Sequence, residues 1–328
     1  QFGIAAALNA WQDAGLPLGS PPEERVRGAV CWGTGLGGTR AVELAYFDVL
    51  QKGRTRASPL LIVMGMHNAA AAHIAMRLGL GGAATTTSVA CASSAIALGE
   101  ALRLIRHGEA EIVVAGGSEA PLTAGMLLAW DAMRVLARGE GEAARSACRP
   151  FSADRAGLVL GEGGAALVLE PYERAEQRGA RIYAELAGYG ASCDHHHLAQ
   201  PLAAGQRRAL RAALDDAGLA TDELDYVNSH GTGTVEGDPG AGGEAVVHVG
   251  GQPHQHLAGE AVGLADAPDL EELGRMVHVT PGELGDVDEA VDAVEVDEGA
   301  EVDDVGDRAL DHLAALEPVE NLLAGLLA

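Results

Sequence analysis

The chain has 328 residues, of which 48% are hydrophobic and 45 are glycine, so it suits a packed α/β protein of one large or two ordinary domains and excludes a disordered chain. No apolar run approaches the length of a membrane span, and the net charge of −25 argues against nucleic-acid binding. The four cysteines show no CxxC spacing and no disulfide framework, which predicts a cytosolic protein without a metal or redox-pair site.

The charge is unevenly distributed along the chain. Residues 1–239 hold 20 basic and 26 acidic residues, a balance of −6, whereas residues 240–328 hold 2 basic and 21 acidic residues, a balance of −19. The second segment repeats a few residue types and is typical of a self-repelling, low-complexity tail. Translation from a shifted reading frame would explain the change at Pro239, and the start at Gln1 without a methionine predicts that N-terminal residues are missing.

Apolar runs alternate with helical patterns along the first part of the chain. Short apolar runs bounded by glycine predict strands, and apolar residues at helical spacing predict helices. The expected order is a strand over Arg27–Trp32, a helix over Pro59–Leu78, a strand over Ala84–Val89, a helix over Ser93–His107, a strand over Ile112–Ala115, a helix over Ala124–Leu136 and a strand over Ala165–Leu169. Such alternation implies a layered α/β fold.

Cys91 lies between the threonine-rich run and the alanine-rich helix that follows it. A thiol at a helix start meets backbone N–H groups and the positive end of the helix dipole, and such positions lower the pKa of a cysteine below its free value of about 8.5. Cys91 is therefore a candidate nucleophile. The alternative is that it is a small buried hydrophobic residue, as most free cysteines are.

A second segment, Asp225–Thr234, predicts a short strand that delivers His230 into a glycine- and threonine-rich turn. A cysteine and a histidine far apart in the sequence can meet in the fold as a nucleophile and its partner. The alternatives are that His230 is a core histidine and that the threonines only cap the turn.

Several motifs occur in one order: Ser88–Ser94, Glu111–Glu119, Arg149–Phe151, Gly157–Gly164 and Asp225–Thr234. In residues, order and spacing they resemble the β-ketoacyl-acyl-carrier-protein synthases of the elongating type, and linked motifs are more specific than any single one. The resemblance covers residues 1–238. It implies the thiolase-like, layered αβαβα fold, with the first half nearly complete in residues 1–179, the second half truncated to residues 180–239, and residues 240–328 forming the acidic tail.

The resemblance also implies a reaction and its residues. It is the decarboxylative condensation of an acyl thioester with malonyl-acyl-carrier protein, in fatty acid or polyketide synthesis. Cys91 is the expected nucleophile, His230 is expected to stabilise the enolate, and Thr232 and Thr234 are expected to hydrogen-bond the pantetheine arm. No metal or bound cofactor is implied, because acyl carrier protein presents the substrates on phosphopantetheine, and the expected assembly is a homodimer or a ketosynthase heterodimer.

The sequence departs from the family after Asp238. The family's catalytic lysine has no counterpart, because Lys52 is the one lysine in the chain and precedes the nucleophile. His256 only faintly resembles the second catalytic histidine, and no phenylalanine follows Phe151. An inactive fragment that accepts an acyl group and a chain-length-factor-like partner therefore stay open as alternatives, and a half-built sheet would leave apolar faces uncovered.

Two further patterns could be taken for a dinucleotide-binding site and a metal site. Gly33–Gly38 fits GxGxxG after a strand, but no acidic residue follows at the distance of a dinucleotide site, so we expect a tight glycine turn. Cys193, Asp194 and His195–His197 are adjacent on one short segment, which rarely converges on a single ion, so we expect a polar loop.

Overall fold

The computed structural model describes residues 1–18, 27–139, 142–197, 200–235, 237–238 and the backbone of 245–246. The described residues other than 54–57 belong to one compact unit, which contains all the elements below. The helices described in that part of the chain include none that is both long and apolar enough to cross a membrane.

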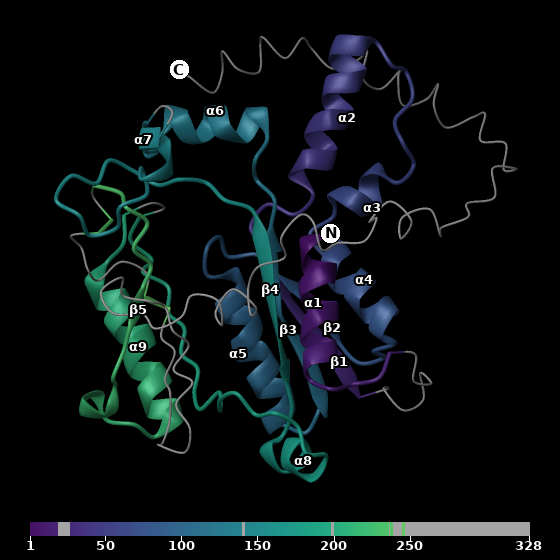
Figure 1. Ribbon diagram of the computed structural model, residues 1–328, viewed down its shortest axis with the longest axis vertical. Helices are drawn as coiled ribbons and strands as arrows, with labels where there is room; N and C mark the ends of the chain where they lie inside the picture. The colour runs from purple at the N-terminus through teal and green to yellow at the C-terminus, as the bar shows by residue number, and fades with distance from the viewer. Residues whose placement is uncertain (19–26, 140–141, 198–199, 236, 239–244, 247–328) are drawn as a thin grey trace, which may run out of the picture. The chain divides into compact units, whose positions relative to one another are not determined.

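A four-stranded sheet forms the centre of this unit (Figure 1). Its strands are β1 (Gly28–Gly33), β2 (Ala84–Thr87), β3 (Ile112–Glu119) and β4 (Gly163–Leu169), in the order β2-β1-β3-β4. β1 runs parallel to both of its neighbours, whereas β4 pairs antiparallel with β3. The carboxyl ends of β1, β2 and β3 therefore share one edge, which is where open α/β sheets place their ligands.

Alternate residues of the central strands enter two different cores because side chains alternate between the faces of a strand. Val30 and Trp32 of β1 pack with α1 (Phe2–Asp13) and α4 (Ala69–Leu78). Ala29 and Cys31 pack against α5 (Ser93–Arg106) on the opposite face. All six residues of β1 are buried, so this strand is covered on both faces as expected for a layered α/β fold.

The remaining elements surround this centre. They are α2 (Thr39–Lys52), α3 (Leu61–Gly65), α6 (Ala124–Ala132), α7 (Glu142–Arg145), α8 (Tyr172–Gln177), α9 (Ala203–Ala217), a 3-10 turn (Thr221–Glu223), β5 (Asn228–Ser229) and β6 (Ala245–Val246). The segment around Tyr189 connects α5 to α9: a Cβ on Gly99 of α5 would overlap the Tyr189 ring, and a Cβ on Gly188 or Gly190 would overlap the backbone of α9. α9, the first helix after residue 180, thus lies beyond α5 with this segment between them.

The expected strands all occur, but two helices differ from the prediction. The helix expected over Pro59–Leu78 is two helices, because Met66 is extended and the turn before it lies against Gly38, whose Cβ would overlap the carbonyl of Met64. α6 ends at Ala132 rather than Leu136, since the Ala137 N–H donates to the Leu158 carbonyl at 2.8 Å. The spacing of apolar residues along the chain cannot reveal the contact of Gly38 with Met64 or that of Ala137 with Leu158.

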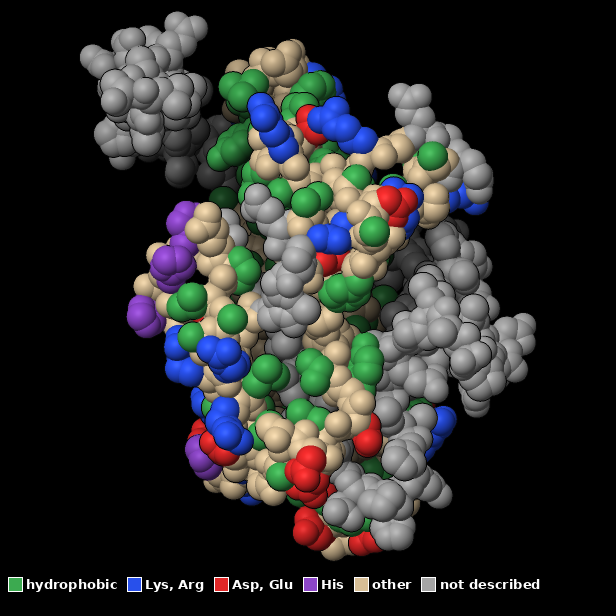
Figure 2. Space-filling view, turned by 90° about the vertical axis from the view of Figure 1, so that its left-hand side faces the viewer, with side chains coloured by type: hydrophobic (Ala, Val, Ile, Leu, Met, Phe, Trp, Pro, Cys, Tyr) green, Lys and Arg blue, Asp and Glu red, His purple; other side chains and the backbone are tan. Residues whose placement is uncertain are grey.

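Large apolar side chains lie at the surface of this unit. Leu50, Ile62 and Leu128 are 70% to 76% exposed. On the face that carries α9, hydrophobic side chains lie among charged ones across the surface (Figure 2). Apolar surface of this kind is typical of a chain that packs against further protein.

Candidate functional site

Cys91 occupies the turn between β2 and α5, two residues before the helix begins. The preceding residue, Ala90, has φ of 50°, a left-handed conformation that is strained for a residue with a Cβ. Ser93 fixes this turn: its hydroxyl donates to the Ala90 carbonyl at 2.6 Å and accepts the Val89 N–H at 2.9 Å. A strained turn held by a buried hydroxyl is typical of a functional position.

Glycines let the start of α5 sit directly on the sheet. A Cβ on Gly33, at the end of β1, would overlap the backbone of Ser93, and a Cβ on Gly117 of β3 would lie 2.8 Å from the Ser94 Cβ. No other residue type fits such a close approach. The sequence therefore places the helix start, and Cys91 with it, at the carboxyl edge of the parallel strands.

The thiol of Cys91 is exposed, which excludes the alternative that it is a buried core cysteine. All four cysteines lie in the described residues and none of them forms a disulfide. Cys148 and Cys193 are also exposed, whereas Cys31 is buried in the sheet, where desolvation raises the pKa of its thiol. Cys91 is distinguished from the other exposed thiols by its place at a helix start.

The glycine-rich segment after β1 is a tight turn, in agreement with the interpretation from sequence. Its amides are occupied from within the protein, because the Glu119 carboxylate accepts the Gly35 N–H at 2.6 Å and the Leu36 N–H at 3.1 Å. The same carboxylate accepts the Thr34 hydroxyl at 3.1 Å. Amides that would cradle a phosphate in a dinucleotide site are thus already paired with a carboxylate.

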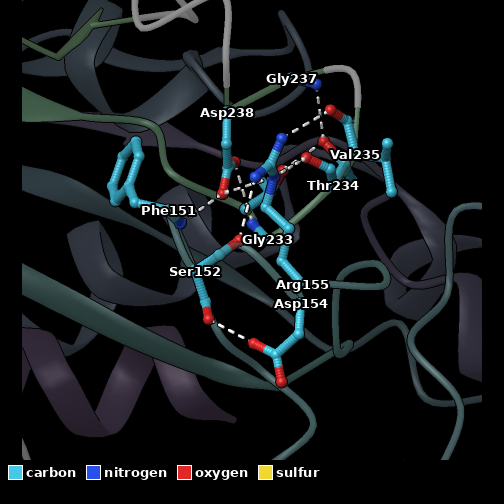
Figure 3. A network of polar contacts seen from close by, with 10 residues as sticks. Phe151, Ser152, Asp154, Arg155, Gly233, Thr234, Val235, Gly237 and Asp238 are labelled. Atoms are coloured by element: carbon cyan, nitrogen blue, oxygen red, sulfur yellow. Dashed lines mark hydrogen bonds and ion pairs between the residues drawn. The ribbon is translucent and has the colours of Figure 1, made fainter.

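His230 directly follows β5, and a polar network holds the loop that it begins (Figure 3). The carboxylate of Asp238 accepts the Gly233 N–H at 3.1 Å and the Phe151 N–H at 2.8 Å, and lies 3.8 Å from the Arg155 Nε. Only 2% of the Asp238 side chain and 16% of the Arg155 side chain are exposed. Buried charges need partners of this kind, so the pair anchors the loop to the segment after Arg149.

Arg155 completes this network with backbone acceptors. Its guanidinium donates to the carbonyls of Thr234 at 3.0 Å, Val235 at 2.9 Å and Ser152 at 2.9 Å. Phe151 itself has φ of 63°, and a Cβ on Gly231 would lie 2.9 Å from its ring. The residue after His230 must therefore be small for the loop to lie against Phe151.

The two threonines of the loop contact each other, with their hydroxyl oxygens 3.2 Å apart. The Thr234 hydroxyl also accepts the Gly237 N–H at 3.1 Å, which is the turn-capping role that threonine often takes. The structure thus gives Thr234 a role within the loop, and since one hydroxyl donates to the other, the pair keeps one O–H donor and two lone pairs for further partners.

The contacts described above hold Cys91 through β1, β2 and α5, and hold the His230 loop through residues 149–158. Three residues of these networks were not predicted as site residues: Glu119, Arg155 and Asp238. Glu119 ends the motif Glu111–Glu119 and Asp238 ends the region of resemblance, and those positions were the available signal; Arg155 lies between two motifs.

Two other sequence features are placed by the structure. Lys52 lies at the end of α2, paired with Asp48 at 2.7 Å. His195–His197 form an exposed loop before α9, in which the His197 Nδ1 accepts the Gln200 N–H at 3.1 Å. Among the residues that the structure describes, no three histidine, cysteine or carboxylate side chains are arranged to hold a metal ion. His256 lies outside the described residues.

Two family models match this chain. The model of the β-ketoacyl synthase N-terminal domain matches residues 1–175, and that of the C-terminal domain matches residues 183–257. The second match continues past Asp238, where the resemblance read from the motifs ends, and includes His256.

Curated relatives match the same region. Nodulation protein E of Rhizobium leguminosarum bv. trifolii is 43% identical over 235 residues, which is 72% of this chain and 56% of the relative. The 3-oxoacyl-[acyl-carrier-protein] synthase 2 of Staphylococcus aureus is 36% identical over 259 residues, which is 78% of this chain and 63% of the relative. The chain thus spans about three fifths of the length of these relatives.

Solved structures share the fold. A type II polyketide synthase acyl-carrier protein in complex with its ketosynthase aligns with a TM-score of 0.67 and 32% identity, over 73% of this chain and 60% of the other. A β-ketoacyl synthase from Burkholderia phymatum aligns with a TM-score of 0.64 and 34% identity, over 72% of this chain and 57% of the other. These neighbours confirm the thiolase-like α/β fold, and the chain belongs to the β-ketoacyl synthase family.

Proposed function

We propose that this chain is a condensing acyltransferase, a β-ketoacyl-acyl-carrier-protein synthase that joins an acyl group to a malonyl-derived unit in fatty acid or polyketide synthesis. The observation that carries the proposal is the exposed Cys91 thiol on a strained turn at a helix start, at the carboxyl edge of the parallel strands. Membership of the β-ketoacyl synthase family supports the same chemistry.

The reaction has two stages. The Cys91 thiolate attacks the thioester carbonyl of the acyl carrier, the carbonyl–sulfur bond to the carrier breaks, and the carrier thiolate takes up a proton. The backbone N–H of Cys91, next to the N-terminus of α5, is suited to stabilise the oxyanion. Malonyl-carrier protein then loses carbon dioxide, and the resulting enolate attacks the acyl carbonyl and releases the thiolate of Cys91.

The His230 loop supplies the second stage in this proposal. His230 stabilises the enolate as carbon dioxide leaves, and its pairing with Cys91 at one site is required for the two stages to connect. The hydroxyls of Thr232 and Thr234 hydrogen-bond the pantetheine arm, whose amides need partners once they leave water. The anchoring of the loop by Asp238 supports a fixed position for these groups.

Acyl carrier protein is the partner that this reaction requires, and no bound metal or cofactor takes part in it. A solved neighbour is described as a ketosynthase in complex with its acyl-carrier protein. We place the reaction in the cytosol, with the chain acting as a homodimer or beside a second ketosynthase-like subunit, and the exposed apolar side chains of α2 and α3 support such an association.

A second candidate function is acyl acceptance without condensation. The observation that favours it is the place of Lys52, the one lysine of the chain, at the end of α2 in an ion pair with Asp48. No other lysine is available to assist decarboxylation. In this case Cys91 would still be acylated, but the malonyl carrier would stay intact.

The test uses the full chain with butyryl-loaded and malonyl-loaded acyl carrier protein, beside the variants Cys91→Ala and His230→Ala. The mass of the carrier reports condensation, and the mass of the chain reports acylation. The proposal predicts condensation by the wild type, neither step in Cys91→Ala, and acylation without condensation in His230→Ala. Acylation without condensation in the wild type would instead establish the second candidate, and no acylation at all would contradict both.

A further inference from the structure

Glu119, the last residue of β3, holds the loop that follows the neighbouring strand β1. Its carboxylate accepts three donors of that loop: the Thr34 hydroxyl, the Gly35 N–H and the Leu36 N–H, at 3.1, 2.6 and 3.1 Å. Hydrogen bonds to a carboxylate are shorter and stronger than those between neutral groups. The backbone from Thr34 to Leu36 is thereby fixed from one side.

The same loop is fixed from its other side by the turn that carries Cys91. The Thr34 N–H donates to the Thr87 carbonyl at 3.1 Å, and the Ser88 hydroxyl donates to the Gly35 carbonyl at 3.3 Å. A Cβ on Gly35 would lie 3.7 Å from the Cα of Ala90, the strained residue before Cys91. The loop therefore lies directly against the nucleophile turn.

The strand order places this loop between Glu119 and the turn that carries Cys91. β1 lies between β3, which carries Glu119, and β2, which leads into the Cys91 turn. From the contacts described, we propose that Glu119 is a positioning residue for Cys91, acting through the loop Thr34–Leu36. The proposal rests on the proposed function in that Cys91 is the thiol to be acylated, but the coupling itself is a property of the fold.

The physical reason is the strain at Ala90. A left-handed alanine persists only where its surroundings fix it, and here the surroundings are Ser93 on one side and the Glu119-bound loop on the other. Without the carboxylate, two amides and a hydroxyl lose their acceptor and the loop can move away from Ala90. A turn with more freedom holds the Cys91 thiol in the attacking position for less of the time, which lowers the rate of acylation and leaves the affinity for the carrier unchanged.

The experiment compares Glu119→Ala and Glu119→Gln with Glu43→Ala as a matched control. Glu43 also accepts a threonine hydroxyl and a glycine amide, from Thr123 at 2.5 Å and Gly125 at 3.1 Å, but its contacts are at the start of α6. All variants carry Cys148→Ser and Cys193→Ser, so that Cys91 is the one exposed cysteine left in the described part of the chain. Rates are expressed per folded chain, which is counted as the fraction whose buried Cys31 stays unmodified by iodoacetamide.

The first measurement is single-turnover acylation of Cys91 by butyryl-carrier protein over a range of carrier concentrations. We expect Glu119→Ala to lower the saturating rate about tenfold with the half-saturating carrier concentration unchanged, and Glu119→Gln, which keeps one acceptor oxygen, to lower it less. Glu43→Ala should react at the wild-type rate. A wild-type saturating rate in Glu119→Ala, or an equal fall in Glu43→Ala, would overturn the positioning role.

The second measurement needs no carrier protein and so separates this proposal from the proposed function. Amide hydrogen exchange is followed in peptides that cover residues 33–38 and 87–93, in Glu119→Gln and in Glu43→Ala. Faster exchange in both segments of Glu119→Gln, and in neither segment of Glu43→Ala, is the expected result. Faster exchange in residues 33–38 alone would show that the loop and the Cys91 turn are independent, and would overturn the inference even if Cys91 is acylated.

Discussion

Removal of the Asp238 carboxylate tests the account of the His230 loop. This side chain is 2% exposed and accepts the Gly233 and Phe151 N–H groups at 3.1 and 2.8 Å, with the Arg155 Nε at 3.8 Å. Asp238→Ala leaves both amides without an acceptor and leaves a cavity. Asp238→Asn keeps one carbonyl oxygen for one amide but turns an NH₂ group toward the other.

The magnitude follows from these contacts. An unpaired buried donor costs about 1–3 kcal/mol, and removing one partner of a buried ion pair costs about 3–5 kcal/mol. Arg155 keeps three carbonyl acceptors, and its ion-pair distance is long, so the cost falls at the low end. We expect Asp238→Ala to lower the free energy of unfolding by about 3 kcal/mol and Asp238→Asn by about 2 kcal/mol.

Urea unfolding followed by circular dichroism measures these values, and limited proteolysis reports whether the loop opens before the rest of the unit. Asp154→Asn is the control, because that carboxylate is 66% exposed and its ion pair with Arg149 lies at the surface, where the effect stays small. If Asp238→Ala were no more destabilising than this control, the carboxylate would not anchor the loop.

Three further predictions concern the packing around Cys91 and the second half. Gly33→Ala should abolish soluble expression because its Cβ would overlap the backbone of Ser93, whereas Gly161→Ala, which meets open space, should express normally. Ser93→Ala should lower the free energy of unfolding by about 1–3 kcal/mol and slow iodoacetamide labelling of the nucleophile, as thermal unfolding and peptide mapping will report. Partial burial disfavours the charged form of Asp216, but hydrogen bonds from the Tyr189 N–H and Arg106 outweigh this effect and hold the pKa of its carboxyl below the ordinary value. The ionised carboxylate therefore adds to the free energy of unfolding above about pH 4, and this stabilisation is lost as the pH falls through the lower pKa of the folded state. The destabilisation caused by Asp216→Asn in urea should therefore shrink as the pH is lowered from 5 to 3, and a difference independent of pH would contradict this assignment.

The sequence was sufficient to predict the strands and the start of α5. Short apolar runs predict β1 and β3, and the side chains of both strands point alternately into two cores. The segment between Thr87, where β2 ends, and Ser93, where α5 begins, places Cys91 at the helix start. The thiolase-like fold was predicted from linked motifs, since no periodicity of a single segment specifies how layers stack.

The contacts within the site could not be predicted. Glu119 binds a loop that is 83 to 85 residues away, and Asp238 binds Phe151 at a separation of 87 residues, so neither pairing leaves a local pattern. α1, α2 and α9 were also not predicted. The division at residues 179 and 239 stays a prediction, and the acidic tail lies outside the described residues apart from the backbone of 245–246.

Mapping the acyl adduct tests directly whether Cys91 is the acylated nucleophile. The full chain is incubated with butyryl-carrier protein, digested and analysed by peptide mass spectrometry. We expect a butyryl thioester on the peptide that contains Cys91, and its loss in Cys91→Ala. An adduct confined to Cys148 or Cys193, which are also exposed, or no adduct on a folded chain would contradict this expectation.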